Sequence, residues 1–149
     1  TENCWPRRRR TLKEATLIPE FNDNGYLPPG IHPATLDEIA ARFGTESELR
    51  RVQMESLRWM VALACQAGVL RIVLNGSFVT DRYEPNDVDC VLLIDDNYPR
   101  EMVANEELLE GLPFLTIEIV REDGFRQLTE RTFANDRYHV PKGLIEVLP

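Results

Sequence analysis

The segment LNGSFVTDRYEPNDVDCVLLID, residues 74–95, decides the expected fold. A short apolar run ends at Gly76, and a second apolar run follows Asp87 and Asp89. Because side chains alternate along a strand, we expect these two carboxylates to lie on one face of a sheet. Carboxylates on one face repel each other unless a cation or a proton lies between them. The segment therefore predicts two strands, with a site for a cation at the start of the second.

Outward from this segment, the chain predicts an α/β (α+β) fold, a small mixed β-sheet backed by helices. Apolar and β-branched residues concentrate in four runs that we expect to be strands: residues 69–76, 87–95, 113–120 and 140–148. Helical spacing of apolar residues and helix-capping residues predict four helices: residues 35–43, 45–68, 99–112 and 123–133. The unbroken apolar run Cys90–Ile94 indicates a strand that is buried on both faces.

Each of the first two predicted helices begins with a capping box, Thr35 with Glu38 and Thr45 with Glu48. The residues of the second helix that we expect to face the core are Leu49, Val52, Ser56, Trp59, Met60, Leu63 and Ala67. Trp59 and Met60 are interpreted as core residues and not as part of a cofactor site. The apolar side expected for the helix at 99–112 consists of Met102, Val103, Leu108, Leu109 and Leu112.

The chain divides into an irregular N-terminal arm, residues 1–34, and a single domain, residues 35–149. The arm is dense in proline, glycine, asparagine and aspartate, which interrupt regular elements. Its basic run, Arg7–Arg10, has two interpretations: contact with RNA or an acidic partner, or a solvated arm, which we favour because charge runs usually face water.

Composition restricts the classes of function. The chain has 149 residues and a net charge of -8, which indicates one soluble domain without general affinity for DNA or RNA backbones. No segment reaches the length of a membrane span. The three cysteines, Cys4, Cys65 and Cys90, are widely spaced, and the last two fall in apolar runs where buried free thiols are common. These observations favour a reducing compartment and a cytoplasmic location.

Asp87 and Asp89 have the chemistry of ligands for a hard divalent cation, Mg²⁺ or Mn²⁺. Two such ions, roughly 3.5–4 Å apart, can hold both the attacking and the leaving oxygen of a phosphoryl displacement. Glu118 is the candidate for a third acid, since it interrupts the apolar strand at 113–120. The alternative is that Glu118 faces solvent by alternation together with Thr116. We favour the metal ligand.

Gly76 and Ser77 suit the same chemistry. Glycine lets the backbone approach a ligand closely, and successive N–H groups at such a turn can hold anionic oxygens. The Ser77 hydroxyl can donate to a terminal phosphate. Lys142 follows a proline and precedes a glycine, which places its charge on a constrained turn, and it is the best candidate among the basic residues to neutralise phosphate.

The order of these features resembles the polymerase-β-type nucleotidyltransferases, and in particular small stand-alone bacterial members. Their signature is Gly-Gly or Gly-Ser, a spacer of this size, and Asp-x-Asp or Asp-x-Glu, which here matches residues 74–94; the element order extends the resemblance to residues 45–120. The resemblance implies a nucleotidyltransferase fold in which Gly76 and Ser77 hold the triphosphate of an NTP. It also implies that Asp87 and Asp89 bind two magnesium ions and that Glu118 helps to activate an acceptor hydroxyl.

Two readings of function stay open. The first is an enzyme that moves a nucleoside monophosphate from an NTP to a hydroxyl of a protein, an RNA or a small molecule; the resemblance makes a toxin–antitoxin pair a plausible setting for it. The second is a module that has lost activity, keeps the fold and binds a protein partner. Asn75, which stands where the family usually has an apolar residue, and a Glu in place of the frequent third Asp favour the module. The intact glycine, serine and paired aspartates favour the enzyme, which we prefer.

Overall fold

The computed structural model describes residues 18–148 and confirms the predicted fold class. Its strands are β1 (Ile31–Thr35), β2 (Arg71–Asn75), β3 (Val88–Leu93), β4 (Leu115–Val120) and β5 (Leu144–Leu148). Its α-helices are α1 (Leu36–Phe43), α2 (Glu48–Ala67), α3 (Met102–Glu110) and α4 (Glu122–Gln127). Two short helical turns complete the elements, η2 (Ser77–Val79) and η3 (Leu128–Thr132).

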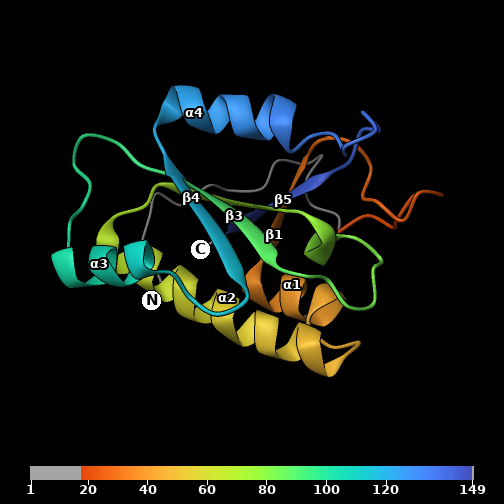
Figure 1. Cartoon of the computed structure of the whole chain (residues 1–149), viewed down its shortest axis with the longest axis horizontal. Helices are drawn as coiled ribbons and strands as arrows, with labels where there is room; N and C mark the ends of the chain where they lie inside the picture. The colour runs from red at the N-terminus through yellow and green to blue at the C-terminus, as the bar shows by residue number, and fades with distance from the viewer. Residues whose placement is uncertain (1–17, 149) are drawn as a thin grey trace.

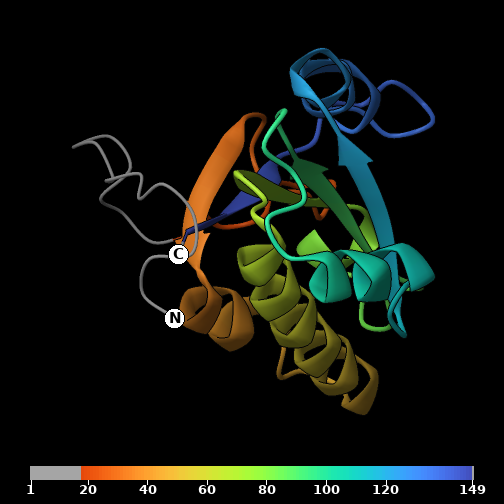
Figure 2. The same cartoon turned by 90° about the vertical axis from the view of Figure 1, so that its left-hand side faces the viewer.

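The strands form one mixed sheet in the order β1-β5-β2-β3-β4. Strand β2 is antiparallel to both β3 and β5, whereas β3 runs parallel to β4 and β1 runs parallel to β5. Helices α1, α2 and α3 lie on one side of the sheet, and α4 lies on the other side (Figures 1 and 2). The sheet is thus the middle of three layers.

Alternate residues of the central strands enter two different cores. Leu74 and Cys90 pack in the core that the sheet shares with α1, α2 and α3. Val73 and Val91 pack in the smaller core beneath α4, around Phe125. Burial on both faces explains why β3 from Cys90 onward is a continuous apolar run and not an alternating one.

The first strand shows that the predicted irregular arm is wrong at its C-terminal end. Residues 31–35 form β1 and pair in parallel with β5, and Leu27 is already fully buried. Pro33 concealed this strand from the sequence, because proline usually interrupts a ladder. β1 is an edge strand, where proline is tolerated. The basic run Arg7–Arg10 lies outside the described residues.

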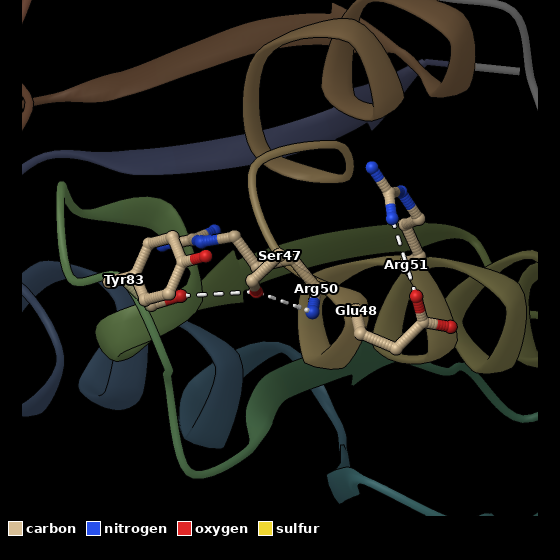
Figure 3. A network of polar contacts seen from close by, with 5 residues as sticks. All are labelled: Ser47, Glu48, Arg50, Arg51 and Tyr83. Atoms are coloured by element: carbon tan, nitrogen blue, oxygen red, sulfur yellow. Dashed lines mark hydrogen bonds and ion pairs between the residues drawn. The ribbon is translucent and has the colours of Figure 1, made fainter.

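The capping box of α1 is confirmed. The Glu38 amide donates to Thr35 Oγ1 at 3.2 Å, and the Thr35 amide donates to Glu38 Oε1 at 2.9 Å. The second box is wrong, because α2 begins at Glu48 with Ser47 as its N-cap. Ser47 Oγ accepts a hydrogen bond from the Arg50 amide at 3.1 Å (Figure 3).

The core-facing side of α2 also differs from the prediction. Met60 is fully buried, as expected, but the Trp59 side chain is 53% exposed. Polar residues take part in the buried side, since Arg50 and Gln53 are buried there together with Leu57. Arg50 and Gln53 obscured the helical pattern in the sequence, because a helix face that contains arginine and glutamine is not expected to pack in a hydrophobic core.

Two further predictions about packing are wrong in part. Leu108 on α3 and Leu112 just after it are buried as predicted, but Met102, Val103 and Leu109 are exposed, and Ala104 is buried instead. Cys90 is a buried free cysteine, as predicted, but Cys65 is disulfide-bonded. Within residues 18–148, none of the helices combines the length and the apolar character that crossing a membrane requires.

Candidate functional site

The turn at Gly76 and the carboxylate of Asp89 are in direct contact. Asn75, the last residue of β2, pairs with Asp89 across the antiparallel ladder, so the turn begins beside β3. Gly76 has φ +81° and ψ -168°, a backbone region that is essentially restricted to glycine. A Cβ atom on residue 76 would lie 2.2 Å from Asp89 Oδ2. The structure therefore brings together the Gly-Ser turn and Asp89, one of the acids that the sequence singled out.

Asp89 and Asp87 differ in their surroundings. Asp87 is exposed, whereas Asp89 is partly buried. Burial, and after it the charge of Asp87, raises the pKa of Asp89, while the charge of Lys142 and a hydrogen bond from Thr116 act in the opposite direction. The negative charge on Asp89 is thus only partly compensated by the protein. A divalent cation bound by both aspartates would compensate it further.

Lys142 is brought to the same place. Burial lowers the pKa of the Lys142 ammonium, and the charges of Asp89 and Asp136 partly offset this effect. The lysine therefore lies within electrostatic reach of both carboxylates. Its own backbone is held by a hydrogen bond from the Lys142 amide to the Ala134 carbonyl at 2.9 Å.

Asp136 orders the loop that ends at Lys142. Asp136 Oδ1 accepts from the amides of Tyr138 at 2.8 Å and Val140 at 2.9 Å. Asp136 Oδ2 accepts from the Tyr26 hydroxyl at 2.7 Å, which ties this loop to the segment before β1. The position of the lysine thus depends on residues far from it in the sequence.

Glu118 shares the face of the sheet with Asp89 but is not its neighbour. Asp89 pairs with Thr116 across the parallel ladder, and Glu118 pairs with Val91, two residues further along. The Glu118 side chain is exposed. Within the described part of the chain, no group of three or more His, Cys, Asp or Glu residues is placed to hold a metal ion. The role of Glu118 as a third acid stays a prediction.

Three residues at the site were not foreseen in their roles. Thr116 lies beside Asp89, at the place where a third acid would be its direct neighbour. Asn75, noted in the sequence only as unusual, is buried, and its Nδ2 donates to the Asp89 carbonyl at 3.4 Å, which joins the ends of β2 and β3. Arg50 is buried beneath the residues that follow the turn. The spacing along α2 could have indicated that Arg50 is buried, since Arg50, Leu57 and Ala64 lie seven residues apart and so share one face of the helix.

Comparison with known proteins identifies the family of this chain but no individual related protein. Residues 19–148 match the profile of a family of unknown function, DUF6932. No curated protein and no solved structure gives a significant match. The matched region begins before β1 and ends at the last residue of β5, so it contains the whole described sheet. The chain belongs to the DUF6932 family.

Proposed function

We propose that this protein is a metal-dependent nucleotidyltransferase that moves a nucleoside monophosphate from an NTP to a hydroxyl group and releases pyrophosphate. The observation that carries this proposal is the contact between Gly76 and the Asp89 carboxylate. It combines a backbone turn that can approach phosphate with an acid that can hold the counter-ion of that phosphate. The resemblance of residues 74–94 to the nucleotidyltransferase signature supports the same proposal.

The residues around this contact suit a metal-bound triphosphate. Asp87 and Asp89 are oxygen ligands of the type that Mg²⁺ and Mn²⁺ prefer, and the raised pKa of Asp89 reflects, after burial, repulsion that a cation would remove. When bound, two such ions would offset charge on the phosphates and lower the pKa of the acceptor hydroxyl. The turn at Gly76 and the Ser77 hydroxyl would donate to the phosphate oxygens, and Lys142 would neutralise part of their charge.

The reaction is a displacement at the α-phosphorus. The acceptor oxygen forms a bond to this phosphorus, the bond to the bridging oxygen of the β-phosphate breaks, and pyrophosphate leaves with the electron pair. The proton of the acceptor hydroxyl goes to a base, for which Glu118 is the candidate from this chain. Its exposure leaves its carboxylate accessible to an incoming acceptor.

The acceptor and the setting are proposed from the resemblance. We propose a hydroxyl of a protein, an RNA or a small molecule as acceptor, and a role as one member of a toxin–antitoxin pair in the cytoplasm. The net charge of -8 favours a protein or a small molecule over a nucleic acid that is bound through its backbone. The disulfide at Cys65 is an observation against a reducing compartment.

One observation favours the alternative, a catalytically inactive module that binds a protein partner. Thr116, and not an acid, lies beside Asp89, and Glu118 does not join the two aspartates in one group. A chain with this arrangement would bind metal and nucleotide but would lack the base for transfer. This alternative keeps the two aspartates and the turn but removes the transfer reaction, because no base takes the proton of the acceptor hydroxyl.

The test is to incubate the protein with Mg²⁺ and each of the four NTPs, labelled at the α-phosphate. Titration calorimetry measures nucleotide binding, and mass spectrometry of added protein, RNA and small-molecule fractions measures transfer. Binding and transfer that both disappear in Asp87→Asn with Asp89→Asn support the enzyme. Binding without transfer to any acceptor supports the inactive module. Absence of metal-dependent NTP binding by the wild type contradicts the enzyme and leaves only a module that binds a protein partner.

A further inference from the structure

We call the ten residues 77–86 the connecting loop. This loop leads from the Gly-Ser turn to the two aspartates. Apart from η2, this loop contains no regular element, so its path depends on contacts with other parts of the chain. The pairing of Asn75 with Asp89 already fixes the turn beside β3, and the loop is the covalent link from Ser77 to Asp87, which directly follows it. What holds the loop therefore bears directly on the geometry of the site.

Side chains from the N-cap and the N-terminal half of α2 hold the backbone of this loop. Ser47 Oγ donates to the Tyr83 carbonyl at 3.2 Å (Figure 3), and Gln53 Nε2 donates to the Pro85 carbonyl at 2.8 Å. Arg50 lies between these two residues in sequence, and residues three apart share one face of a helix. All three side chains are buried. One face of α2 thus supplies donors to carbonyl oxygens along the loop.

Arg50 makes the largest share of these contacts. Its Nη1 donates to the Phe78 carbonyl at 2.8 Å, and its Nη2 donates to the Thr80 carbonyl at 2.9 Å. The Arg82 carbonyl accepts from Nε at 3.1 Å and from Nη2 at 2.5 Å. Nη1 also donates to the Phe43 carbonyl at 2.9 Å, at the end of α1. A guanidinium group has five N–H donors, and these five hydrogen bonds match that number.

The burial of Arg50 makes this arrangement specific. The residue is only 2% exposed, and its guanidinium carbon lies 5.3 Å from the centre of the Phe78 ring. A buried cation is costly unless polar groups surround it, and here backbone carbonyls do so. Lysine keeps the charge but has three donors on a single nitrogen, so it cannot bond four separate carbonyls in a planar fork. The site therefore requires arginine for its shape and not only for its charge.

We infer that Arg50 is a positioning residue, which fixes the connecting loop and thereby holds Ser77, at its start, and Asp87, just after its end, in place before any ligand binds. The part of this inference that concerns the ligand rests on the proposed function. The part that concerns the order of the loop does not. Arg50 touches neither Ser77 nor the aspartates through any of its five hydrogen bonds, so it acts on them through the loop backbone.

The first test is amide hydrogen exchange of the ligand-free protein, compared between wild type and Arg50→Lys. The reporters are the amides of Val79, Thr80 and Asp81, which are hydrogen-bonded to Gly76, Ser77 and Gly25. The reference amides are Leu70 and Ile94, which are bonded to Leu93 and Val120 in the sheet. We expect exchange of the reporters to accelerate at least about tenfold more than that of the references.

The matched control is Arg51→Lys. Arg51 is the next residue on α2, and it is exposed and paired with Glu48 at 3.3 Å (Figure 3). The same substitution there leaves the loop contacts in place, so the reporters should exchange as in the wild type. Reporters that exchange equally in Arg50→Lys and Arg51→Lys, relative to the references, would overturn the inference.

The second test is binding of Mg²⁺ with ATP, and then with the other three NTPs. In Arg50→Lys we expect the Kd to rise by at least about tenfold, while Arg51→Lys keeps the wild-type Kd. Millimolar guanidinium added to Arg50→Ala should slow exchange of the reporters and restore binding, since the small cation can occupy the space of the lost side chain. The same addition to Arg51→Ala should change neither quantity.

The two tests separate this inference from the proposed function. If the wild type binds no metal–nucleotide while the loop of Arg50→Lys still exchanges faster, the proposed function fails and the role of Arg50 in ordering the loop stands. If Arg50→Lys opens the loop but binds nucleotide with wild-type affinity, Arg50 does not position the site. If Arg50→Ala does not fold, amide exchange and nucleotide binding measured on Arg50→Lys still decide both tests.

Discussion

The Asp89 side chain lies against the α-carbon of Gly76, so closely that a methyl group on residue 76 would come within 2.2 Å of Asp89 Oδ2. The turn and the acid are therefore one structural unit. A larger side chain at residue 76 must displace the Asp89 carboxylate, and it must also adopt a backbone conformation that is costly for any residue with a Cβ atom.

Gly76→Ala should abolish metal-dependent NTP binding and lower the free energy of unfolding by about 1–3 kcal/mol. Gly111→Ala is a matched control, because Gly111 has φ +92° and ψ 163° but no atom within 4 Å of the place that a methyl group would take. It should show a similar loss of stability with normal binding. Urea unfolding and calorimetry measure the two quantities. Normal binding by Gly76→Ala would show that the turn does not approach the nucleotide.

Replacing the paired acids should separate stability from binding. Asp87→Asn with Asp89→Asn removes the repulsion between the two carboxylates, so without metal the protein should be at least as stable as the wild type. The rise in Tm that Mg²⁺ or Mn²⁺ produces in the wild type should be lost. Glu106→Gln with Glu110→Gln, both exposed on α3, controls for the loss of two negative charges. A metal-induced shift that survives the double substitution would move the metal site elsewhere.

Glu118→Gln tests the third acid. If Glu118 is the base for the acceptor hydroxyl, transfer should fall by about two orders of magnitude or more, while NTP affinity changes far less. Thr116→Val is the companion variant, because it removes the hydrogen bond to Asp89 and should raise the pKa of that carboxyl further. Equal transfer rates in Glu118→Gln and the wild type would exclude Glu118 from the reaction.

The ion pair beneath α4 should contribute to stability. Glu146 is buried on β5 and accepts from Arg71 Nε at 2.9 Å and Nη2 at 2.7 Å, and Arg71 also lies over the Phe125 ring. Arg71→Met leaves a buried carboxylate without this partner and should cost about 3 kcal/mol in urea unfolding. Arg71→Met with Glu146→Leu should recover much of that loss. A single variant as stable as the wild type would contradict this account.

The loop that carries Lys142 should loosen in acid. Hydrogen bonds from the Val140 amide, the Tyr26 hydroxyl and the Tyr138 amide hold the pKa of Asp136 below its ordinary value. A carboxyl group whose pKa is lower in the folded than in the unfolded protein stabilises the fold above the unfolded value, and this contribution is lost as the pH falls through the folded value. NMR shifts of the Tyr138 and Val140 amides should follow this titration, and Asp136→Asn should abolish it.

The sequence predicted β2 and β3, because strand periodicity is a local signal, and the resemblance to the nucleotidyltransferase signature implied that Gly76 and the aspartates share a site; the structure shows the contact of Gly76 with Asp89. The sequence did not predict β1, whose Pro33 is tolerated only because the strand is at an edge. It also missed the core role of Arg50, since a buried arginine is satisfied by carbonyls that are distant in sequence. The link from Lys142 to Asp136 depends on the folded loop, and no pattern in the sequence contains it.

The place of β5 in the sheet has a consequence for folding during synthesis. This strand follows every other described element in sequence, yet it lies between β1 and β2, and all five of its residues are buried. β2, β3 and β4 can pair as soon as they leave the ribosome, whereas β1 has to wait, unpaired, for residues 144–148. Pairing over such a separation is slow, because a long chain must close before any contact compensates for the lost entropy. A chaperone that protects nascent chains would therefore meet the exposed edges of β1 and β2 until translation reaches β5.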